Sequence, residues 1–430
     1  MNPAKIIYEL GIRLRNPKIP ERLAFLMDSQ FWSLEKLQDH QTTKLRELLV
    51  HANEHSDYYR ELFRRHAIDP LTFESLDDLV RIPPLSKETL LRDTSRIQIK
   101  DGLEKLFYSE TSGSTGKPLV FYRNMDWDAW HRASAFRGYA WHGAKPWDRN
   151  GYLWGYNFAL RKRLKTKILD LLQNRFRLFS YDNAEIDTFA RKLMKSTYLS
   201  GYSSMIYEIA KRINATLPED RKPRLKMVLG TSEKIFEAYQ DEAKKAFGTR
   251  IISEYGAAET GIIAVECASG HMHINMETVI VEIVDEKILV TNLVSRSFPI
   301  IRYELGDYVA LDLKTECACG RKHPIVAEVT GRIGQPIYGS HAQYPSLTLY
   351  YVFKNLAMEA DLIINYQAIQ RKKGELELHI EGCLEAGSRN LLMAEIKNYY
   401  GDDLAVTIFE NADLSSRNRK KRDFVSELDV

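Results

Sequence analysis

The sequence predicts an α/β fold: a large domain with mostly parallel sheets flanked by helices plus a small antiparallel β part, then a small α+β domain. Residues 197–256 alternate between strand-like and helix-like segments, which is typical of parallel strands joined by helices. Residues 278–312 instead alternate apolar and polar positions, as antiparallel hairpins do. The pattern starts afresh after Gly331, so we expect one domain over residues 1–330 and another over residues 331–430.

The composition is that of an ordinary globular protein. The chain has 430 residues, of which 44% are hydrophobic and 28% charged, so its core should need no disulfides. A net charge of +3 gives no reason to expect nucleic acid as a partner. No run approaches the roughly 20 apolar residues of a membrane span, and residues 1–20 lack a signal-peptide pattern. Four cysteines are too few for a disulfide framework and fit a reducing cytoplasm.

Residues 1–100 are expected to form a mainly helical scaffold that covers the larger domain. Apolar residues at helical spacing mark one helix face, namely Leu45, Leu48, Leu49 and Ala52. After a turn with two prolines, Ser86 is placed to cap a helix that begins at Lys87.

A polar loop precedes an apolar run at residues 119–122 that is expected to be a strand. The loop consists of Thr111, Ser112, Gly113, Ser114, Thr115, Gly116 and Lys117. Its glycines let the backbone approach an anion, and its hydroxyl and lysine groups can surround phosphate oxygens. It is not a Walker loop, because Gly113 and Gly116 are too close together and Pro118 follows the lysine. A plain polar turn between two strands is the alternative.

Residues 126–141 predict an aromatic-rich helix, whose aromatic stripe we interpret as core rather than as a ligand site. A short strand is expected over residues 151–155. Residues 160–195 alternate basic and apolar positions on helices, and we assign the basic side chains to a solvated face.

Further strands are expected over residues 198–202, 226–230 and 250–256, ending in loops on the side of the sheet where ligands bind. Toward the C-terminus the sequence predicts hairpins, a helix and a last strand, in the order 279–283 with 288–291, 362–369 with 375–380, 391–399 and 404–409. The basic run at 417–422 is expected to be solvated or loosely attached to anions.

Four segments in order carry a family resemblance. They are the loop at 111–117, the segment EYGAAET at 254–260, the segment PIIRYELGD at 299–307 and the segment TGR at 330–332. Their order and spacing resemble the adenylate-forming (AMP-forming acyl ligase) superfamily, and most closely its phenylacetate–CoA ligase branch with the CapK-like proteins named for capsular polysaccharide clusters. Residues 41–88 also resemble that branch, so the match covers nearly the whole chain.

The resemblance implies an enzyme in which a carboxylate attacks the α-phosphorus of ATP, pyrophosphate leaves, and the acyl group passes to a nucleophile. The loop at 111–117 would hold the β- and γ-phosphates, and Glu259 would ligate Mg²⁺. The nucleotide would be held by Ser232, Glu233, Glu254, Tyr255, Asp307 and Arg332. Tyr255 would stack on adenine, and Asp307 would accept hydrogen bonds from both ribose hydroxyls. Residues 1–330 would be the adenylation domain, and residues 331–430 a mobile lid.

The lid of this family carries a lysine that bridges the carboxylate and the α-phosphate, and Lys420 is the better match here. The glycine that precedes this lysine in the family is missing, and Lys421 is the neighbouring alternative. The hinge also departs from the family, because no aspartate follows Arg332 closely, and Glu304 stands where a second arginine is usual. These departures concern the swing of the lid, and with it the second half-reaction, more than they concern adenylation.

Three of the four cysteines and two histidines form a second constellation in residues 267–319. Sulfur and imidazole ligands from two short loops suit a closed tetrahedral zinc site of structural type. Matching to related sequences of the branch gives Cys267, His273, Cys317 and Cys319 as ligands, with His271 as the alternative to His273. Buried thiols with surface histidines are the alternative. Cys383 is interpreted as a core residue.

The resemblance therefore implies an ATP-dependent carboxylate ligase that uses Mg²⁺ and transfers the acyl group to the thiol of CoA. An apolar or aryl acid pocket is assigned to Trp154, Gly155, Tyr202 and Ser203. An amide ligase that acts on an amine, such as an amino sugar, and a nucleotide-binding pseudoenzyme are the alternatives. The expected partners are a small carboxylic acid and its acceptor; a homodimer is compatible with the sequence, which does not specify the oligomeric state.

Overall fold

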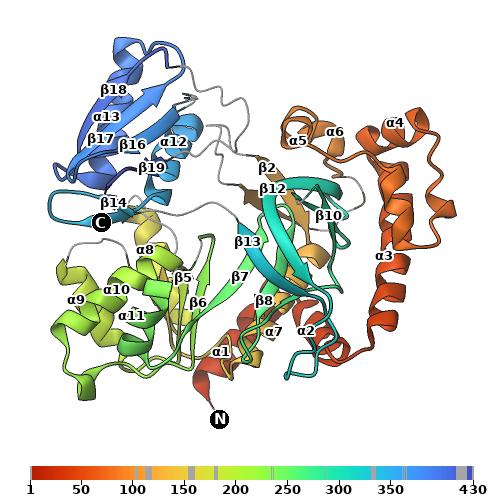
Figure 1. The fold of residues 1–430 in the computed structure, drawn as a ribbon, viewed down its shortest axis with the longest axis horizontal. Coiled ribbons are helices and arrows are strands. Elements are labelled where there is room, and N and C mark those ends of the chain that lie inside the picture. Colours follow the sequence, from red (N-terminus) through yellow and green to blue (C-terminus); the bar gives the residue numbers. More distant parts are fainter. Residues whose placement is uncertain are drawn as a thin grey trace. The chain divides into compact units, whose positions relative to one another are not determined.

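The computed structural model describes residues 2–100, 102, 105–111, 119–153, 160–178, 183–233, 235, 237–285, 287–330, 336–360, 362, 364, 366–412 and 424–428. These residues belong to two compact units (Figure 1). The first unit contains residues 1–111, 119–147 and 252–331, and the second contains residues 112–118, 148–251 and 332–430.

Helices dominate the beginning of the first unit, as predicted for residues 1–100. They are α1 (Pro3–Arg15), α2 (Ile19–Ser29), α3 (Leu34–His55), α4 (Asp57–Arg65), α5 (Lys87–Arg92) and α6 (Thr94–Ile97), with short 3₁₀ turns at Pro70–Thr72 and Leu76–Arg81. The predicted apolar face of α3 is buried, since Leu45, Leu48, Leu49 and Ala52 are at most 1% exposed. The capping prediction is confirmed, because Ser86 Oγ accepts a hydrogen bond from Thr89 N at 3.1 Å at the start of α5.

The rest of the first unit is one aromatic-rich helix and a set of antiparallel strands. These are α7 (Met125–Trp141), the paired strands β1 (Leu106–Glu110) and β2 (Val120–Asn124), and β7 (Ile251–Ala257), β8 (Gly261–Glu266), β9 (Met272–Ile274), β10 (Val279–Val284), β11 (Lys287–Asn292), β12 (Ile300–Asp312) and β13 (Ile325–Thr330). Within the sheet the strands are neighbours in the order β10-β11-β12-β13-β9-β8-β7. Trp127, Trp130 and Phe136 of α7 are buried, which confirms that its aromatic stripe is core.

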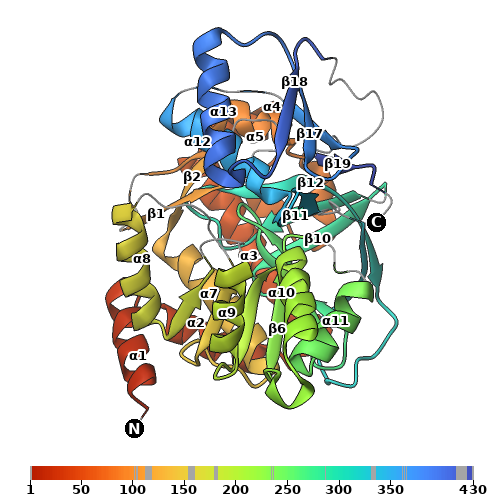
Figure 2. The same ribbon diagram turned by 90° about the vertical axis from the view of Figure 1, so that its left-hand side faces the viewer.

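The second unit begins with the parallel strands that the sequence predicts. Strands β3 (Asn150–Leu153), β4 (Arg175–Arg177), β5 (Tyr198–Tyr202) and β6 (Met227–Thr231) are parallel neighbours in the order β6-β5-β3-β4. Their connections hold α8 (Leu160–Leu172), α9 (Asn183–Leu193), α10 (Ser203–Thr216), a 3₁₀ turn (Glu219–Arg221) and α11 (Glu237–Phe247), and Figure 2 shows α9, α10 and α11 packed against these strands. Parallel strands with helical crossovers confirm the α/β class.

The C-terminal segment of the second unit has its own small sheet. Strands β16 (Tyr366–Gln370), β17 (Glu375–Ile380), β18 (Ala405–Phe409) and β19 (Phe424–Ser426) pair in the order β18-β17-β16-β19, beside α12 (Leu347–Glu359), α13 (Ala386–Tyr400) and the hairpin β14 (Pro336–Tyr338) with β15 (Gln343–Pro345). The predicted hairpin is confirmed, although its first strand begins at Tyr366 rather than at Leu362. The assignment of Cys383 to the core is wrong: its side chain is exposed in the turn after β17.

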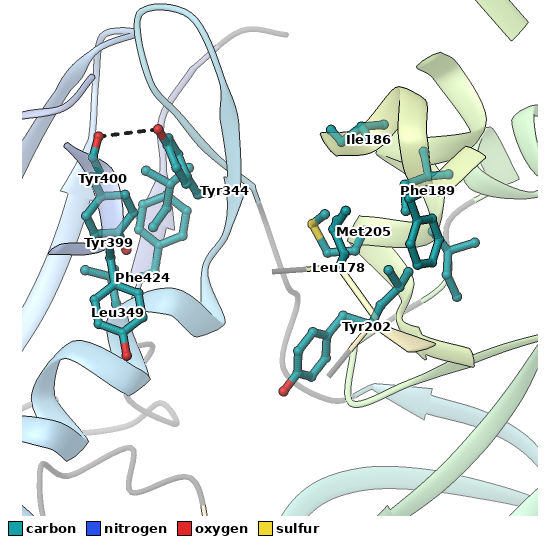
Figure 3. Close-up of a cluster of buried hydrophobic side chains, with 14 of the residues drawn as sticks. Leu178, Ile186, Phe189, Tyr202, Met205, Tyr344, Leu349, Tyr399, Tyr400 and Phe424 are labelled. Atoms are coloured by element: carbon teal, nitrogen blue, oxygen red, sulfur yellow. Dashed lines mark hydrogen bonds between the residues drawn. The ribbon is translucent and has the colours of Figure 1, made fainter. Parts of the chain in front are cut away.

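Apolar side chains from both segments of the second unit belong to one buried cluster (Figure 3). One group lies around β5, α9 and α10 and includes Phe189, Tyr202 and Met205; the other comes from the C-terminal segment and includes Tyr344 and Tyr400. Of the described helices in the chain, none combines the length and the apolar character that crossing a bilayer requires.

Candidate functional site

Two residues assigned to the nucleotide site from separate motifs meet in the first unit. Tyr255 lies on β7 and Asp307 on β12, and the Tyr255 hydroxyl donates a hydrogen bond to Asp307 Oδ2 at 3.0 Å. Burial raises the pKa of Tyr255, and the nearby Asp307 carboxylate raises it further. The tyrosine is therefore a neutral donor at physiological pH, and its hydrogen bond fixes the orientation of the carboxylate.

Glu259, assigned to magnesium, lies in the turn between β7 and β8 and is only 7% exposed. Asn292 at the end of β11 stabilises this turn, because its Nδ2 donates to the carbonyl oxygens of Thr260 at 3.1 Å and of Glu259 at 3.4 Å. Asn292 is itself buried, and its Oδ1 accepts from Val294 N at 3.1 Å. Sequence reasoning missed Asn292, since a polar residue at the end of a strand gives no signal of its distant partner.

Glu254 precedes Tyr255 on β7, so the two side chains point to opposite faces of the strand. Desolvation raises the pKa of Glu254 to about 7. The carboxyl group is therefore partly protonated near neutral pH, and an anionic ligand nearby would meet less repulsion than beside an ordinary glutamate.

In the second unit, Ser232 and Glu233 follow the carboxyl end of β6, as predicted. Ser232 is exposed and has a φ of 68°, a left-handed conformation that is uncommon for a residue with a side chain. The neighbouring turn contributes Ser203 at the start of α10, whose Oγ donates to the carbonyl oxygen of Glu233 at 3.3 Å. A Cβ on Gly230 would lie 2.7 Å from Ser203 Oγ, so only glycine lets these two turns approach so closely.

Two residues assigned to the acid pocket are buried in the second unit. Tyr202 is 1% exposed, belongs to the apolar cluster of Figure 3, and its hydroxyl is 2.9 Å from the hydroxyl of Tyr351 on α12. Ser203 is fully buried, and its hydroxyl serves the turn described above. In this conformation both side chains stabilise the fold around the carboxyl end of β5.

The remaining predicted site residues lie outside the described part of the chain. They are Ser112, Gly113, Ser114, Thr115, Gly116, Lys117, Trp154, Gly155, Arg332, Lys420 and Lys421. The two ends of the phosphate loop are described and are tied together: Thr111 N donates to Leu119 O at 3.0 Å, and Leu119 N donates to Thr111 Oγ1 at 3.2 Å. The loop therefore connects the paired strands β1 and β2. Strand β2 is the strand that the sequence predicts after the loop.

The structure brings together the four predicted metal ligands in the first unit. The ligand atoms of Cys267, His273, Cys317 and Cys319 all lie within 4.8 Å of one another. Cys267 Sγ is 3.6 Å from Cys317 Sγ, and Cys319 Sγ is 3.2 Å from His273 Nε2. A tetrahedron with Zn–S bonds of about 2.3 Å has edges of about 3.7 Å between sulfur atoms, so the donor set fits zinc. His271 is not in this group of ligand atoms.

The surroundings of the four ligands also suit a metal. His273 Nδ1 lies 3.1 Å from the carbonyl oxygen of His323, a contact that presents Nε2 to the sulfur atoms. Burial works against a thiolate at Cys267, but hydrogen bonds from the backbone at His271 and Ser269 and from the neighbouring cysteines together lower the pKa of Cys267. A thiolate is the form of cysteine that binds metal.

We predict that Cys317→Ser lowers the affinity for zinc by more than about 100-fold, since even outer partners of metal ligands are worth 10- to 100-fold. Metal content by elemental analysis and the thermal midpoint with and without chelator measure this loss. His271→Ala and Cys383→Ser are matched controls that should keep their zinc, because neither residue belongs to the group of four. Loss of zinc in His271→Ala, or its retention in Cys317→Ser, would contradict this ligand set.

A buried ionic cluster lies behind the metal ligands, and sequence reasoning did not find it. Arg137 of α7 and Glu277 are 1% and 0% exposed, with Arg137 Nη1 at 2.6 Å from Glu277 Oε1. Ser29 Oγ donates to the same carboxylate at 2.6 Å, and His323 Nε2 lies 3.3 Å from it. The pKa of Glu277 falls well below its ordinary value: burial opposes this, but the charge of Arg137 prevails. Glu277 is thus a buried anion with a matched set of partners.

The chain is similar in sequence to two named relatives and in fold to a solved ligase structure. No family model matches it. Protein CapK of Staphylococcus aureus is 23% identical over 310 residues, which make up 68% of this chain and 67% of CapK. The phenylacetate-coenzyme A ligase of Thermus thermophilus is 24% identical over 383 residues, 81% of this chain and 82% of the relative. A solved structure of 2-hydroxyisobutyryl-CoA ligase with 2-HIB-AMP and CoA shares the fold, with a TM-score of 0.61 and 17% identity over 93% of this chain and 91% of the other.

Proposed function

We propose that the chain, which is similar to Protein CapK and to phenylacetate-coenzyme A ligase, is an adenylate-forming ligase that activates a carboxylic acid with ATP and transfers the acyl group to CoA. A carboxylate oxygen of the acid attacks the α-phosphorus, and the bond to pyrophosphate breaks. The CoA thiol then loses its proton and attacks the acyl carbon, and AMP leaves. The observation that carries the proposal is the meeting of Tyr255 and Asp307, which come from two separate motifs of the family.

In this proposal the protein works by positioning and by charge rather than through a nucleophile of its own. Asp307, held by Tyr255, would accept hydrogen bonds from the ribose hydroxyls. Glu259 would hold Mg²⁺, a cation that prefers oxygen ligands. The loop at 111–117 would bind the outer phosphates, and Lys420 in the lid would bridge the carboxylate and the α-phosphate. Zinc on the four cysteine and histidine ligands would be structural, because the donor set is complete without a substrate.

If Glu259 holds Mg²⁺, Asn292 should set the geometry of that site. We predict that Asn292→Ala raises the Mg²⁺ concentration for half-maximal adenylation about tenfold, since two hydrogen bonds to the turn of Glu259 are lost. Titration of the initial rate with Mg²⁺ measures this, and saturating Mg²⁺ should restore most of the rate. A uniform loss of rate at all Mg²⁺ concentrations would instead indicate general damage to the fold.

An amide ligase, which passes the acyl group to an amine instead of to CoA, is the second candidate function. It is kept beside the CoA ligase because the chain is about as similar to Protein CapK, at 23% identity, as to the phenylacetate-coenzyme A ligase of Thermus thermophilus, at 24%. The test follows AMP release with one activated acid in the presence of CoA or of a panel of amines. The proposal predicts release that depends on CoA together with formation of the thioester. Release that ignores CoA and responds to an amine would replace the thiol ligase by an amide ligase.

A further inference from the structure

Helix α8 of the second unit displays its apolar side chains to solvent. Leu164, Ile168 and Leu171 recur at helical spacing and are 63%, 54% and 76% exposed, and Leu172 beside them is 49% exposed. A helix of a globular protein ordinarily turns such a stripe toward the core. An apolar stripe on one exposed helix face marks an interaction surface.

The polar side of α8 is the side that holds it to the protein. Asp170 is only 4% exposed and forms a two-point ion pair with Arg177 of β4, with Nε to Oδ2 at 2.8 Å and Nη2 to Oδ1 at 2.9 Å. Thr166, one turn earlier on the same side, is half-buried. This anchor fixes the rotation of the helix about its axis, so the stripe of Leu164, Ile168 and Leu171 faces away from β4.

Cationic residues border the exposed stripe. At about 100° per residue, Lys165 and Lys167 fall on opposite sides of the line through Leu164, Ile168 and Leu171, and both lysines are exposed. Apolar side chains bordered by lysines are the pattern of a helix that lies in the interface of an anionic bilayer, with its leucines among the acyl chains and its lysines among the headgroups.

We propose that α8 docks the protein onto the surface of a bilayer rich in anionic lipid. A second copy of the chain is a poorer occupant for two reasons. Pairing two such helices would bring their lysines together, whereas anionic headgroups neutralise them. One face of this helix also offers only about 200 Å², from a length of about 20 Å and a width of about 10 Å, against the about 800 Å² per partner of a stable dimer.

The experiment is flotation of the full chain with vesicles of phosphatidylcholine alone or mixed with phosphatidylglycerol. The protein should bind the mixed vesicles, and binding should weaken with salt. The triple variant L164Q/I168Q/L171Q should bind at least about tenfold more weakly, because its stripe no longer enters the acyl region. The pair K165Q/K167Q should lose about fivefold per lysine. The matched pair K244Q/K245Q on α11, where both lysines are exposed, should change binding less than twofold.

Three results would overturn the docking surface. They are failure of the wild-type chain to bind anionic vesicles at low salt, equal binding by the triple variant, and equal losses in the two lysine pairs. A dimer in sedimentation velocity that the triple variant abolishes would assign the surface to a second copy instead. The five side chains changed in these variants, three from the stripe and two lysines, lie on the surface, so circular dichroism should show unchanged folding. The inference does not depend on the ligase activity, and either can fail alone.

Discussion

Replacing Lys420 by alanine is expected to lower the rate of acyl-adenylate formation by about 10²- to 10³-fold, the usual cost of removing one group that stabilises charge in a transition state. The pentacovalent phosphorus and the departing pyrophosphate concentrate negative charge, which a lysine beside the α-phosphate would neutralise. Single-turnover measurement of pyrophosphate release gives this rate separately from acyl transfer. Thioester formation from preformed acyl adenylate should change much less, because the lysine acts in the first step.

Lys421→Ala is the matched control, since the two lysines are neighbours of equal charge. It should retain adenylation within a few-fold. If Lys421→Ala loses the activity and Lys420→Ala keeps it, the catalytic lysine is Lys421 and the alignment of the lid is shifted by one residue. If both variants adenylate at the wild-type rate, neither lysine has the proposed role.

The second large effect concerns stability. Glu277→Gln is expected to lower the free energy of unfolding by about 3–5 kcal/mol, because it leaves Arg137 as a buried charge without its counterion. Denaturant unfolding at neutral pH measures the loss. Glu47→Gln is the matched control: Glu47 pairs with Arg296 at 2.9 Å and with Lys44 at 3.0 Å, but these groups are 34–45% exposed, so the cost should be at most about 1 kcal/mol. Equal effects in the two variants would show that the cluster around Glu277 is not the stabilising feature we describe.

The same cluster predicts a pH dependence. The folded-state pKa of Glu277 lies well below its ordinary value of 4.5, so its contribution to stability is complete above about pH 4.5 and is lost as the pH falls through the folded-state pKa. The difference in unfolding free energy between wild type and Glu277→Gln should therefore shrink as the pH is lowered from 5 to 3. Arg137, His323 and Ser29 are the groups that face this carboxylate, and burial lowers the pKa of His323 below its ordinary value of 6.5. A difference that stays constant over this range would contradict the assignment.

Much of the fold could be predicted from local signals. Strand–helix alternation predicted the parallel strands β5 and β6, and the cap at Ser86 predicted the start of α5, because both depend on residues close in sequence. The assignment of Cys383 to the core was wrong, because a thiol next to a turn has no periodic pattern that reveals its exposure. The alternation of basic and apolar residues in α8 was visible in the sequence. The side of the helix that faces the sheet could not be predicted, because the ion pair of Asp170 with Arg177 turns the apolar stripe outward.

The candidate site residues likewise divide into those with a signal in the sequence and those that depend on contacts between distant residues. The metal ligands could be found because the chain has only four cysteines and related sequences of the branch carry cysteine and histidine at similar places, and the structure brings the four ligands together. Tyr202 and Ser203 were chosen for their place after a strand, and only the packing shows that they are buried. Asn292 and the Arg137–Glu277 pair join residues 32 and 140 positions apart, and no local pattern connects such partners.

ATP–pyrophosphate exchange with a panel of carboxylic acids, aryl acids included, tests the central claim most directly, because exchange requires reversible formation of an acyl adenylate and nothing from the acceptor. The account predicts exchange that depends on Mg²⁺ and on at least one acid. It also predicts that Asp307→Asn weakens this exchange by lowering the apparent affinity for ATP. No exchange with any acid, from a chain that nevertheless binds AMP, would contradict the account and identify a nucleotide-binding protein without ligase activity.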